Sequence, residues 1–202
     1  MQHEKIKQMI TTYGTLYSES LRIRLKGRDD RELFKWFLAS ILMGKRIGEK
    51  IAIKTYLEFE KRAVLTPERI LQSGWDVLVR ILDEGGYVRY DFSTATMLLE
   101  LAKKLKENYG GLNGLYESAF DVADIERKLQ EFKGVGPVTT NIFLRELRVV
   151  WPKSDALVSP VIRGVASRLG IDLQKFKKDI DEFMRLECAL FRVRKLSVND
   201  LI

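Results

Sequence analysis

Two glycines and a proline form the motif whose residue types most directly suggest a chemical role. The motif is KGVGP, residues 133–137. Glycine accepts a positive φ or a close backbone approach at little steric cost, and proline is well tolerated at the first position of a helix. We therefore predict a tight turn that directs the amides of Gly134 and Gly136, together with the start of the next helix, outward. Amides in this arrangement bind anions such as phosphate.

The residues on either side of this turn predict two amphipathic helices. Apolar residues recur at helical spacing before and after it, at Ile125, Leu129 and Phe132 and then at Val138, Ile142, Phe143 and Leu147. Two such helices joined by a short turn form a helix–hairpin–helix, predicted here over about residues 125–146. On this topology the expected anion is a DNA phosphate. A helix end followed by an ordinary new helix would explain the same glycines without a ligand.

The segment from Phe132 to Asp155 resembles the signature of the helix–hairpin–helix DNA glycosylases, the superfamily of endonuclease III. In that family the hairpin L-P-G-V-G-x-x-T-A is followed by a Gly/Pro-containing loop and a catalytic Asp. The counterparts here are FKGVGPVTT, residues 132–140, and WPKSD, residues 151–155. The form G-x-G-P-x-T, followed by L-R and P-x-x-D, is most similar to the alkylpurine branch. With GY at 86–87 and YGG at 109–111, the resemblance covers about residues 30–170.

The resemblance implies an all-α fold with two lobes and the hairpin at the cleft between them. Residues 1–46 and 147–202 would form the terminal lobe, and residues 47–146 the central helical bundle that ends in the hairpin. The apolar periodicity agrees with an all-α fold, because it predicts no unambiguous strand.

The implied function is excision of a damaged or mismatched base from double-stranded DNA in base excision repair. The base is flipped out of the stack, and its N-glycosidic bond is hydrolysed to leave an abasic site. Cleavage passes through an oxocarbenium-like state, which needs a fixed negative charge beside C1′ and a positioned water. The resemblance assigns the carboxylate to Asp155, the wedge that fills the vacated stack to Met43, and the DNA-backbone contacts to Lys133, Gly134, Val135, Gly136 and Thr139.

Asp155 has two neighbours that compete with it for the catalytic assignment. The Arg-Leu-Gly at 168–170 lies about one helical turn too far from Asp155 for the family spacing, and Ser159 stands where the shorter spacing would put the carboxylate. We choose Asp155 because Trp151 and Pro152 match the loop before the family's Asp and because a serine carries no charge. Residues 156–159 would then be a longer loop or an added turn. Asp172 is the reserve candidate.

Both aspartates also have a structural interpretation. Asp155 would cap the helix that contains Val161, and Asp172 would cap the helix after Gly170, since aspartate is a favoured N-cap residue.

Val138 predicts a monofunctional enzyme. Bifunctional members of the family carry a lysine two residues after the second hairpin glycine, and its amine attacks C1′. An aliphatic side chain at that position cannot be the nucleophile. Lys133 and Lys153 are near in sequence, but neither matches the family position. The alternatives are a helix–hairpin–helix protein that binds DNA without catalysis and a bifunctional glycosylase/lyase that uses a non-standard lysine.

Further residues are candidates for the base pocket or for DNA contacts. They are Trp36, Tyr87, Arg89, Tyr90 and Val138. Two tyrosines and an arginine on a loop could stack on a base or contact a phosphate. The structural interpretation is that the tyrosines pin the loop to the core and that Trp36 belongs to the core.

The composition fits a nucleic-acid partner and excludes several site types. The net charge is +7, from 35 Lys and Arg against 28 Asp and Glu, which suits a polyanion but would also serve solubility. One cysteine and one histidine exclude an internal disulfide, a four-cysteine iron–sulfur cluster and a His-based triad. We expect no cofactor and no metal site, with a monovalent cation at the hairpin as the one ion considered.

The chain lacks an apolar run of membrane-span length and an apolar N-terminal signal stretch. We therefore expect no membrane partner and a location inside the cell. The family resemblance further implies a monomer and a cytoplasmic, nucleoid-associated location in a prokaryote.

Local signals place several helix boundaries. Asp29 and Thr66-Pro67 predict helix starts, and the glycine pairs at 85–86 and 110–111 predict helix ends. We predict a helix over 94–108 and a new helix from Gly74-Trp75. Apolar residues alternate with basic residues over 21–26, so segment 15–26 fits a strand or a helix, and we favour a helix on the family resemblance.

Overall fold

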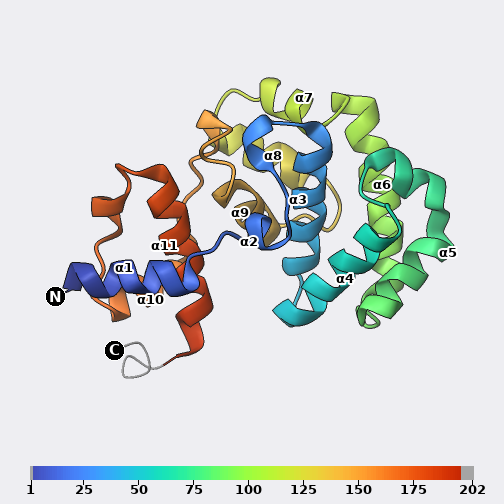
Figure 1. The fold of residues 1–202 in the computed structure, drawn as a ribbon. Helices are drawn as coiled ribbons and strands as arrows, with labels where there is room; N and C mark the ends of the chain where they lie inside the picture. Colours follow the sequence, from blue (N-terminus) through green and yellow to red (C-terminus); the bar gives the residue numbers. More distant parts are fainter. Residues whose placement is uncertain (1, 197–202) are drawn as a thin grey trace. The chain divides into compact units, whose positions relative to one another are not determined.

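The computed structural model describes residues 2–196, and its regular elements are all helical, which confirms the all-α part of the predicted fold (Figure 1). The α-helices are α1 Gln2–Tyr13, α2 Tyr17–Ser20, α3 Asp30–Met43, α4 Glu49–Lys61, α5 Pro67–Gly85, α6 Asp91–Tyr109, α7 Leu112–Glu117, α8 Val122–Gln130, α9 Pro137–Arg145, α10 Pro160–Arg168 and α11 Ile180–Arg192. Short 3-10 turns lie at Leu25–Gly27, Pro152–Ser154, Leu173–Phe176 and Val193–Lys195.

The chain divides into two units whose boundaries differ from the predicted ones. Unit 1 contains Met1–Arg24 and Asp155–Ile202, and unit 2 contains Leu25–Ser154. Residues 25–46 and 147–154, which we expected in the terminal lobe, therefore belong to the same unit as the central bundle. The reason lies in α3, which packs against α9 rather than against a terminal helix. The indole N–H of Trp36 in α3 donates to the carbonyl of Phe143 in α9 at 3.0 Å.

The core of unit 2 forms along α3. Asp29 caps this helix as predicted, accepting from the amide of Arg31 at 2.7 Å. Six apolar residues at helical spacing along α3 are all buried: Leu33, Phe34, Phe37, Leu38, Ile41 and Leu42. Trp36 is also fully buried and belongs to the core, so it is not a surface for base or DNA contact. In Figure 1, α3 lies beside α4 and α9, while α5 lies beside α4 and α6.

The predicted start of α5 and the predicted ends of α5 and α6 agree with the structure, whereas α6 begins at Asp91, three residues before the predicted start at 94. The hydroxyl of Thr66 accepts from the amide of Arg69 at 3.2 Å, and Pro67 is the first helical residue. Gly74 interrupts α5 with φ +72° and ψ 174°, so the new helix expected at this position is the second half of a kinked helix. Gly86 ends α5 and Gly110 ends α6, both in the left-handed conformation.

Segment 15–26 forms much less helix than expected. Only Tyr17–Ser20 is α-helical, and Leu25–Gly27 forms a 3-10 turn. The side chains of Leu21, Ile23 and Leu25 are buried, whereas the three basic residues between and after them are exposed. The alternating pattern therefore reports burial of every second side chain in an irregular segment, not a strand or a continuous helix.

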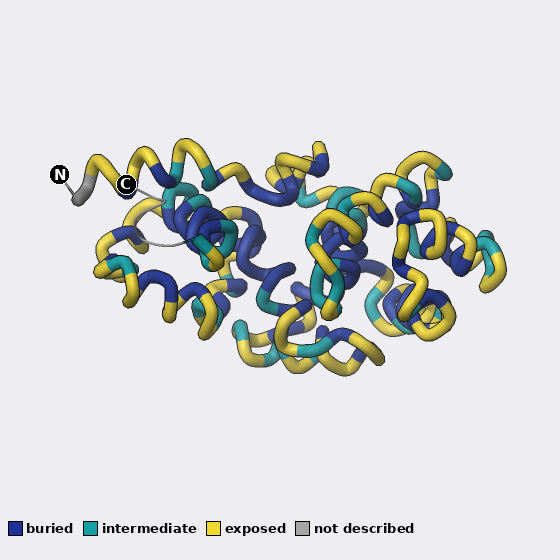
Figure 2. Tube along the Cα trace, turned by 90° about the horizontal axis from the view of Figure 1, so that it is seen from below, coloured by how far each residue is buried: buried dark blue, intermediate teal, exposed yellow. Residues whose placement is uncertain are grey.

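Unit 1 has its own core, built from the two ends of the chain. In it α1 packs against α11, and α10 also packs against α11. The core includes Ile6 and Met9 from α1, Ile162 from α10, and Phe183 and Leu190 from α11. Most helices have both buried and exposed positions (Figure 2), as expected for amphipathic helices that share a core, whereas residues 36–42 of α3 are buried on every side.

Candidate nucleic-acid interface

Two helices flank the glycine turn, as predicted. Helix α8 ends at Gln130, and α9 begins with Pro137 at its first position, with Gly136 as the N-cap residue. The turn between them is closed by a hydrogen bond from the amide of Val135 to the carbonyl of Phe132 at 3.0 Å. In the part of the chain that the structure describes, the amides of Gly134 and Gly136 donate to no backbone acceptor. These two amides are therefore available for a ligand.

The two hairpin glycines meet different requirements. Gly134 has φ +80°, and a β-carbon on it would clash with the sulfur of Met97, so both the conformation and the packing require glycine. Gly136 has an ordinary extended conformation with φ −106° and ψ −176°. A β-carbon on Gly136 would meet no atom within 4 Å. The fold thus requires Gly134, whereas Gly136 leaves open space in front of the turn.

Two of the residues predicted to contact DNA through the hairpin are buried. Val135 is 4% exposed and Thr139 is 2% exposed, so their side chains cannot reach a ligand. Both residues lie on the side of the hairpin that faces the core of unit 2, and they hold the hairpin against that core. Val138, which we placed on the apolar face of the helix, is 62% exposed instead and remains a candidate contact. Lys133 is also exposed, with its ammonium 3.5 Å from Glu100 Oε2.

The turn between α3 and α4 lies against the hairpin. Its first residues approach α9 so closely that a β-carbon on Gly44 would clash with the hydroxyl of Thr139. The ammonium of Lys45 donates to the carbonyl of Gly134 at 3.1 Å. Met43, the predicted wedge residue, is the last residue of α3 and is partly exposed. The structure therefore brings the predicted wedge and the predicted phosphate-binding turn together within unit 2.

The loop between α5 and α6 reaches the same end of α3. The hydroxyl of Tyr87 donates to the carbonyl of Leu42 at 3.0 Å, and burial raises the pKa of this tyrosine above its ordinary value. Tyr87 is fully buried, so it anchors the loop and is not a DNA contact. Arg89 stays exposed, with its guanidinium 5.5 Å from the centre of the partly exposed Tyr90 ring. Arg89 and Tyr90 therefore remain candidate contacts.

Three segments that are distant in sequence thus meet at the C-terminal end of α3. These segments carry the cationic residues Lys45, Arg46, Arg89 and Lys133, of which Lys45 contacts the hairpin directly. Positive charge beside free amides favours a phosphate, because each supplies part of the field that an anion needs.

Asp155 lies in the other unit, at its boundary. Its side chain is 61% exposed, and its Oδ2 lies 3.6 Å from the ammonium of Lys177. It does not cap α10, because Ser159 performs that role by accepting from the amide of Ile162 at 3.3 Å. The capping interpretation of Asp155 is therefore wrong. Residues 155–159 form a loop without helical structure, as the longer-loop interpretation predicted.

Asp172, the reserve carboxylate, does act as a cap. It accepts from the amide of Gln174 at 3.1 Å at the start of a 3-10 turn. This hydrogen bond confirms its structural interpretation.

The residues before Asp155 are firmly anchored in unit 2. Trp151 is fully buried and stacks on Tyr116, with ring centres 4.8 Å apart. The ammonium of Lys153 donates to the carbonyls of Tyr116 at 3.0 Å and Ala119 at 2.6 Å. A lysine in a loop looks like a solvated charge in the sequence, so this anchor was not predicted. Its only signal is the aromatic residue two positions earlier.

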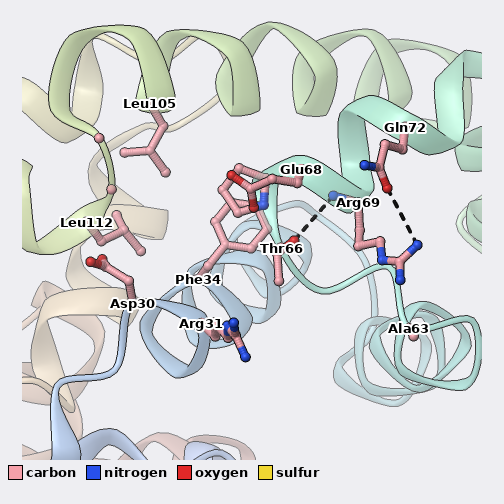
Figure 3. Close-up of a pocket in the computed structure, with 13 residues that line it drawn as sticks. Asp30, Arg31, Phe34, Ala63, Thr66, Glu68, Arg69, Gln72, Leu105 and Leu112 are labelled. Atoms are coloured by element: carbon pink, nitrogen blue, oxygen red, sulfur yellow. Dashed lines mark hydrogen bonds between the residues drawn. The ribbon is translucent and has the colours of Figure 1, made fainter.

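A cavity of about 700 Å³ lies at the opposite end of α3 (Figure 3). Phe34, Leu105 and Leu112 line it with apolar atoms, and Arg31 and Arg69 are among its charged lining residues. Asp30, at the first position of α3, also lines it, whereas the hairpin contacts follow Met43 at the last position. A helix of 14 residues is about 21 Å long, so the cavity is separate from the candidate interface. Sequence analysis did not identify this cavity, because its lining residues come from segments that are far apart in the chain.

Among residues 2–196, no three His, Cys, Asp or Glu side chains are grouped so that they could hold a metal ion. Over the same residues, no helix combines the length and the apolar character needed to cross a bilayer. Comparison with known proteins adds no family assignment, because no family model, no curated protein and no solved structure matches the chain.

Proposed function

We propose that this protein is a monofunctional DNA glycosylase of base excision repair. The observation that carries the proposal is the contact between the glycine turn and the α3–α4 turn. It combines the amides of Gly134 and Gly136, which have no backbone acceptor within residues 2–196, with Lys45 and with Met43, the residue that the resemblance assigns to the wedge. Phosphate binding and base extrusion need such groups side by side.

In the binding step, the amides of Gly134 and Gly136 and the start of α9 hold a backbone phosphate. The open space in front of Gly136 lets the phosphate approach the main chain. Lys133 and Arg46 add sequence-independent attraction, since both are exposed cations beside the two turns. The ligand is double-stranded DNA, bound by one copy of the chain in a prokaryotic cytoplasm.

In the extrusion step, Met43 fills the space that the flipped nucleotide leaves. An unbranched, partly exposed side chain at the end of a helix can enter a base stack without moving the helix itself. Unstacking a base costs a few kcal/mol, least at a damaged or mismatched pair, so the wedge also favours lesions.

In the chemical step, the carboxylate of Asp155 stabilises the oxocarbenium-like sugar and orients the attacking water. Two observations support this role: Asp155 is exposed, and Ser159 rather than Asp155 caps α10. Asp172, by contrast, caps a 3-10 turn. The reaction ends at an abasic site because Val138 offers no amine at the hairpin. Lys153 is a poor substitute, since its ammonium is held by two carbonyl oxygens.

A panel of duplexes tests the function, each carrying one alkylated, oxidised or mismatched base and a labelled strand. We expect strand cleavage of one or more substrates only after alkali treatment, which marks base excision without lyase activity. Cleavage without alkali, with a product trapped by borohydride, would instead show a lyase.

A second candidate is a DNA-binding protein without catalysis. The observation that favours it is the position of Asp155 Oδ2, 3.6 Å from the ammonium of Lys177, which offsets the negative charge that catalysis needs. Saturable binding of the duplexes with no cleavage of any substrate would support this candidate and exclude the glycosylase over the lesions in the panel.

A further inference from the structure

The carbonyl oxygens of the hairpin turn are bound by two lysines from other elements. Lys45 of the α3–α4 turn donates to the carbonyl of Gly134 at 3.1 Å, and Lys104 of α6 donates to the carbonyl of Glu131 at 3.1 Å. Lys104 also lies 5.6 Å from the centre of the Phe132 ring. The turn is therefore held from its carbonyl side by two ammonium groups, while the amides of Gly134 and Gly136 have no backbone partner in the described part of the chain.

These contacts occupy the carbonyl oxygens that a monovalent cation, the one ion considered for this hairpin, would need as ligands. Such an ion would need outward carbonyl oxygens as ligands. The carbonyl of Gly134 already faces the ammonium of Lys45, and the carbonyl of Phe132 is used by the amide of Val135. An ion on the same Gly134 oxygen would stand within a few ångströms of the ammonium, where two like charges repel. The residues of this hairpin therefore do not fit a bound ion.

We propose that the ammonium of Lys45 serves as a tethered cation that holds the hairpin turn in its phosphate-binding conformation. This inference rests on the proposed function, because it assumes that the hairpin binds DNA. A tethered charge is present at a high effective concentration and does not depend on the salt composition of the cell. It also places one positive charge next to the amides that receive the phosphate.

The position of Gly134 explains why a cation is useful there. Gly134 has φ +80°, a conformation that glycine adopts readily but does not keep without support. The ammonium of Lys45 supports this conformation by its hydrogen bond to the carbonyl of Gly134. The side chain of Met97 packs against Gly134 on the side where a β-carbon would lie. Without Lys45, the turn would lose the one side-chain hydrogen bond to Gly134 among the described residues.

The test compares DNA binding in different monovalent salts at one ionic strength. Affinity for an undamaged duplex is measured by fluorescence anisotropy in potassium, sodium and tetramethylammonium chloride. The parent protein should bind with the same affinity, within about twofold, in all three. Lys45→Met keeps the length of the side chain and removes its charge. In tetramethylammonium chloride this variant should bind DNA about tenfold more weakly than the parent, a difference that corresponds to the loss of one charged hydrogen bond. In potassium or sodium chloride its affinity should return toward the parental value. Only the small ions can reach the vacated carbonyl.

Lys50→Met is the matched control. Lys50 is an exposed lysine in the first turn of α4, so its replacement removes the same charge from the same region without touching the hairpin. Any loss of affinity in this variant should be equal in the three salts. The inference is overturned if the parent itself depends on the identity of the cation. It is also overturned if Lys45→Met and Lys50→Met behave alike.

Hydrogen exchange separates this inference from the proposed function. The amide of Val135 closes the turn, so Lys45→Met should speed its exchange in the absence of DNA, and Lys50→Met should not. If the parent binds no DNA but Lys45 protects this amide, the function proposed for the hairpin is wrong and the role of Lys45 in fixing the turn stands. If the exchange is unchanged, the turn does not need Lys45 and the inference fails, whatever the DNA affinity.

Discussion

Gly44 and Thr139 lie in direct contact, at the end of α3 and in the first turn of α9. A β-carbon on Gly44 would overlap the hydroxyl of Thr139 and would lie 3.1 Å from the carbonyl oxygen of Ser40. This contact connects the predicted wedge segment to the hairpin, because Met43 precedes Gly44 and Thr139 follows Gly136-Pro137-Val138.

Gly44→Ala should therefore destabilise the protein. Overpacking of a buried contact costs about 1–3 kcal/mol, and Thr139 is too buried to turn away. Urea unfolding measures the difference. Gly48→Ser is the control in the same turn, since a side chain at Gly48 meets nothing within 4 Å and serine is a favoured residue at this N-cap position. Equal stability of Gly44→Ala and the parent would show that the two turns do not pack as described.

Gly136→Val should lower DNA affinity without lowering stability. Valine accepts the extended conformation of Gly136, and its side chain enters the open space that we assign to the phosphate. The dependence of log affinity on log salt should become shallower by about 0.9 for each DNA phosphate that the variant no longer binds. Gly134→Val should lower both affinity and stability, because Gly134 has φ +80°. Anisotropy titrations over a salt series and urea unfolding provide the two readouts. Parental affinity and salt slope in both variants would rule out the hairpin as the phosphate site.

Asp155→Asn should abolish most excision while leaving folding and DNA binding intact. The amide keeps the size of the side chain and removes its charge, and Asp155 does not cap α10. We expect a loss of at least about a hundredfold in the single-turnover rate, equal to about 2.7 kcal/mol of transition-state stabilisation. Asp172→Asn serves as the control, with unchanged excision, since Asp172 caps a 3-10 turn. Excision at the parental rate by Asp155→Asn would remove Asp155 from the mechanism.

Met43→Ala should impair excision from duplex DNA more than excision from single strands. The difference arises because the wedge replaces a base in a stack, and unstacking costs a few kcal/mol only where a stack exists. Single-turnover rates on the same lesion in both substrates measure it. Met43 would be a packing residue if both rates fell by the same factor.

Trp75 should be the tryptophan whose fluorescence a quencher in the solvent can reach. The chain has three tryptophans, of which Trp36 and Trp151 are fully buried and Trp75 is 40% exposed. Acrylamide should quench one component of the emission, and Trp75→Phe should remove that component. The variant should remain stable, because a phenylalanine can still stack on Phe92, whose ring centre lies 5.3 Å from that of Trp75. Strong quenching that persists in Trp75→Phe would contradict the burial of the other two.

The sequence predicted those features that depend on local chemistry. Asp29, Thr66 and Gly110 sit at helix ends because a cap or a positive φ is needed within one turn of the residue itself. The hairpin was found for the same reason, since its glycines and Pro137 are adjacent in the chain.

The features that sequence analysis missed depend on contacts between distant residues. Lys45 and Gly134 are 89 positions apart, and a lysine after a helix end looks like any solvated charge. Thr139 matched the motif but lies on the buried side of α9, because packing against Gly44 decides which side faces out. We predicted the first unit boundary between residues 46 and 47, whereas the structure has it between 24 and 25. Nothing in the composition of α3 distinguishes a packing partner in α9 from one in a terminal helix.

The pairing of α1 with α11 has a consequence for synthesis of the protein on the ribosome. Unit 2 is encoded by one continuous stretch, whereas the core of unit 1 needs both Ile6 and Leu190. At about 5–20 residues per second, the ribosome needs roughly 10–40 s to add the residues that separate Ile6 from Leu190. During most of that time the apolar side of α1 has no partner, while residues 25–154 can already fold. The exposed apolar side of nascent α1 is therefore a segment that a chaperone can protect until α11 has been made.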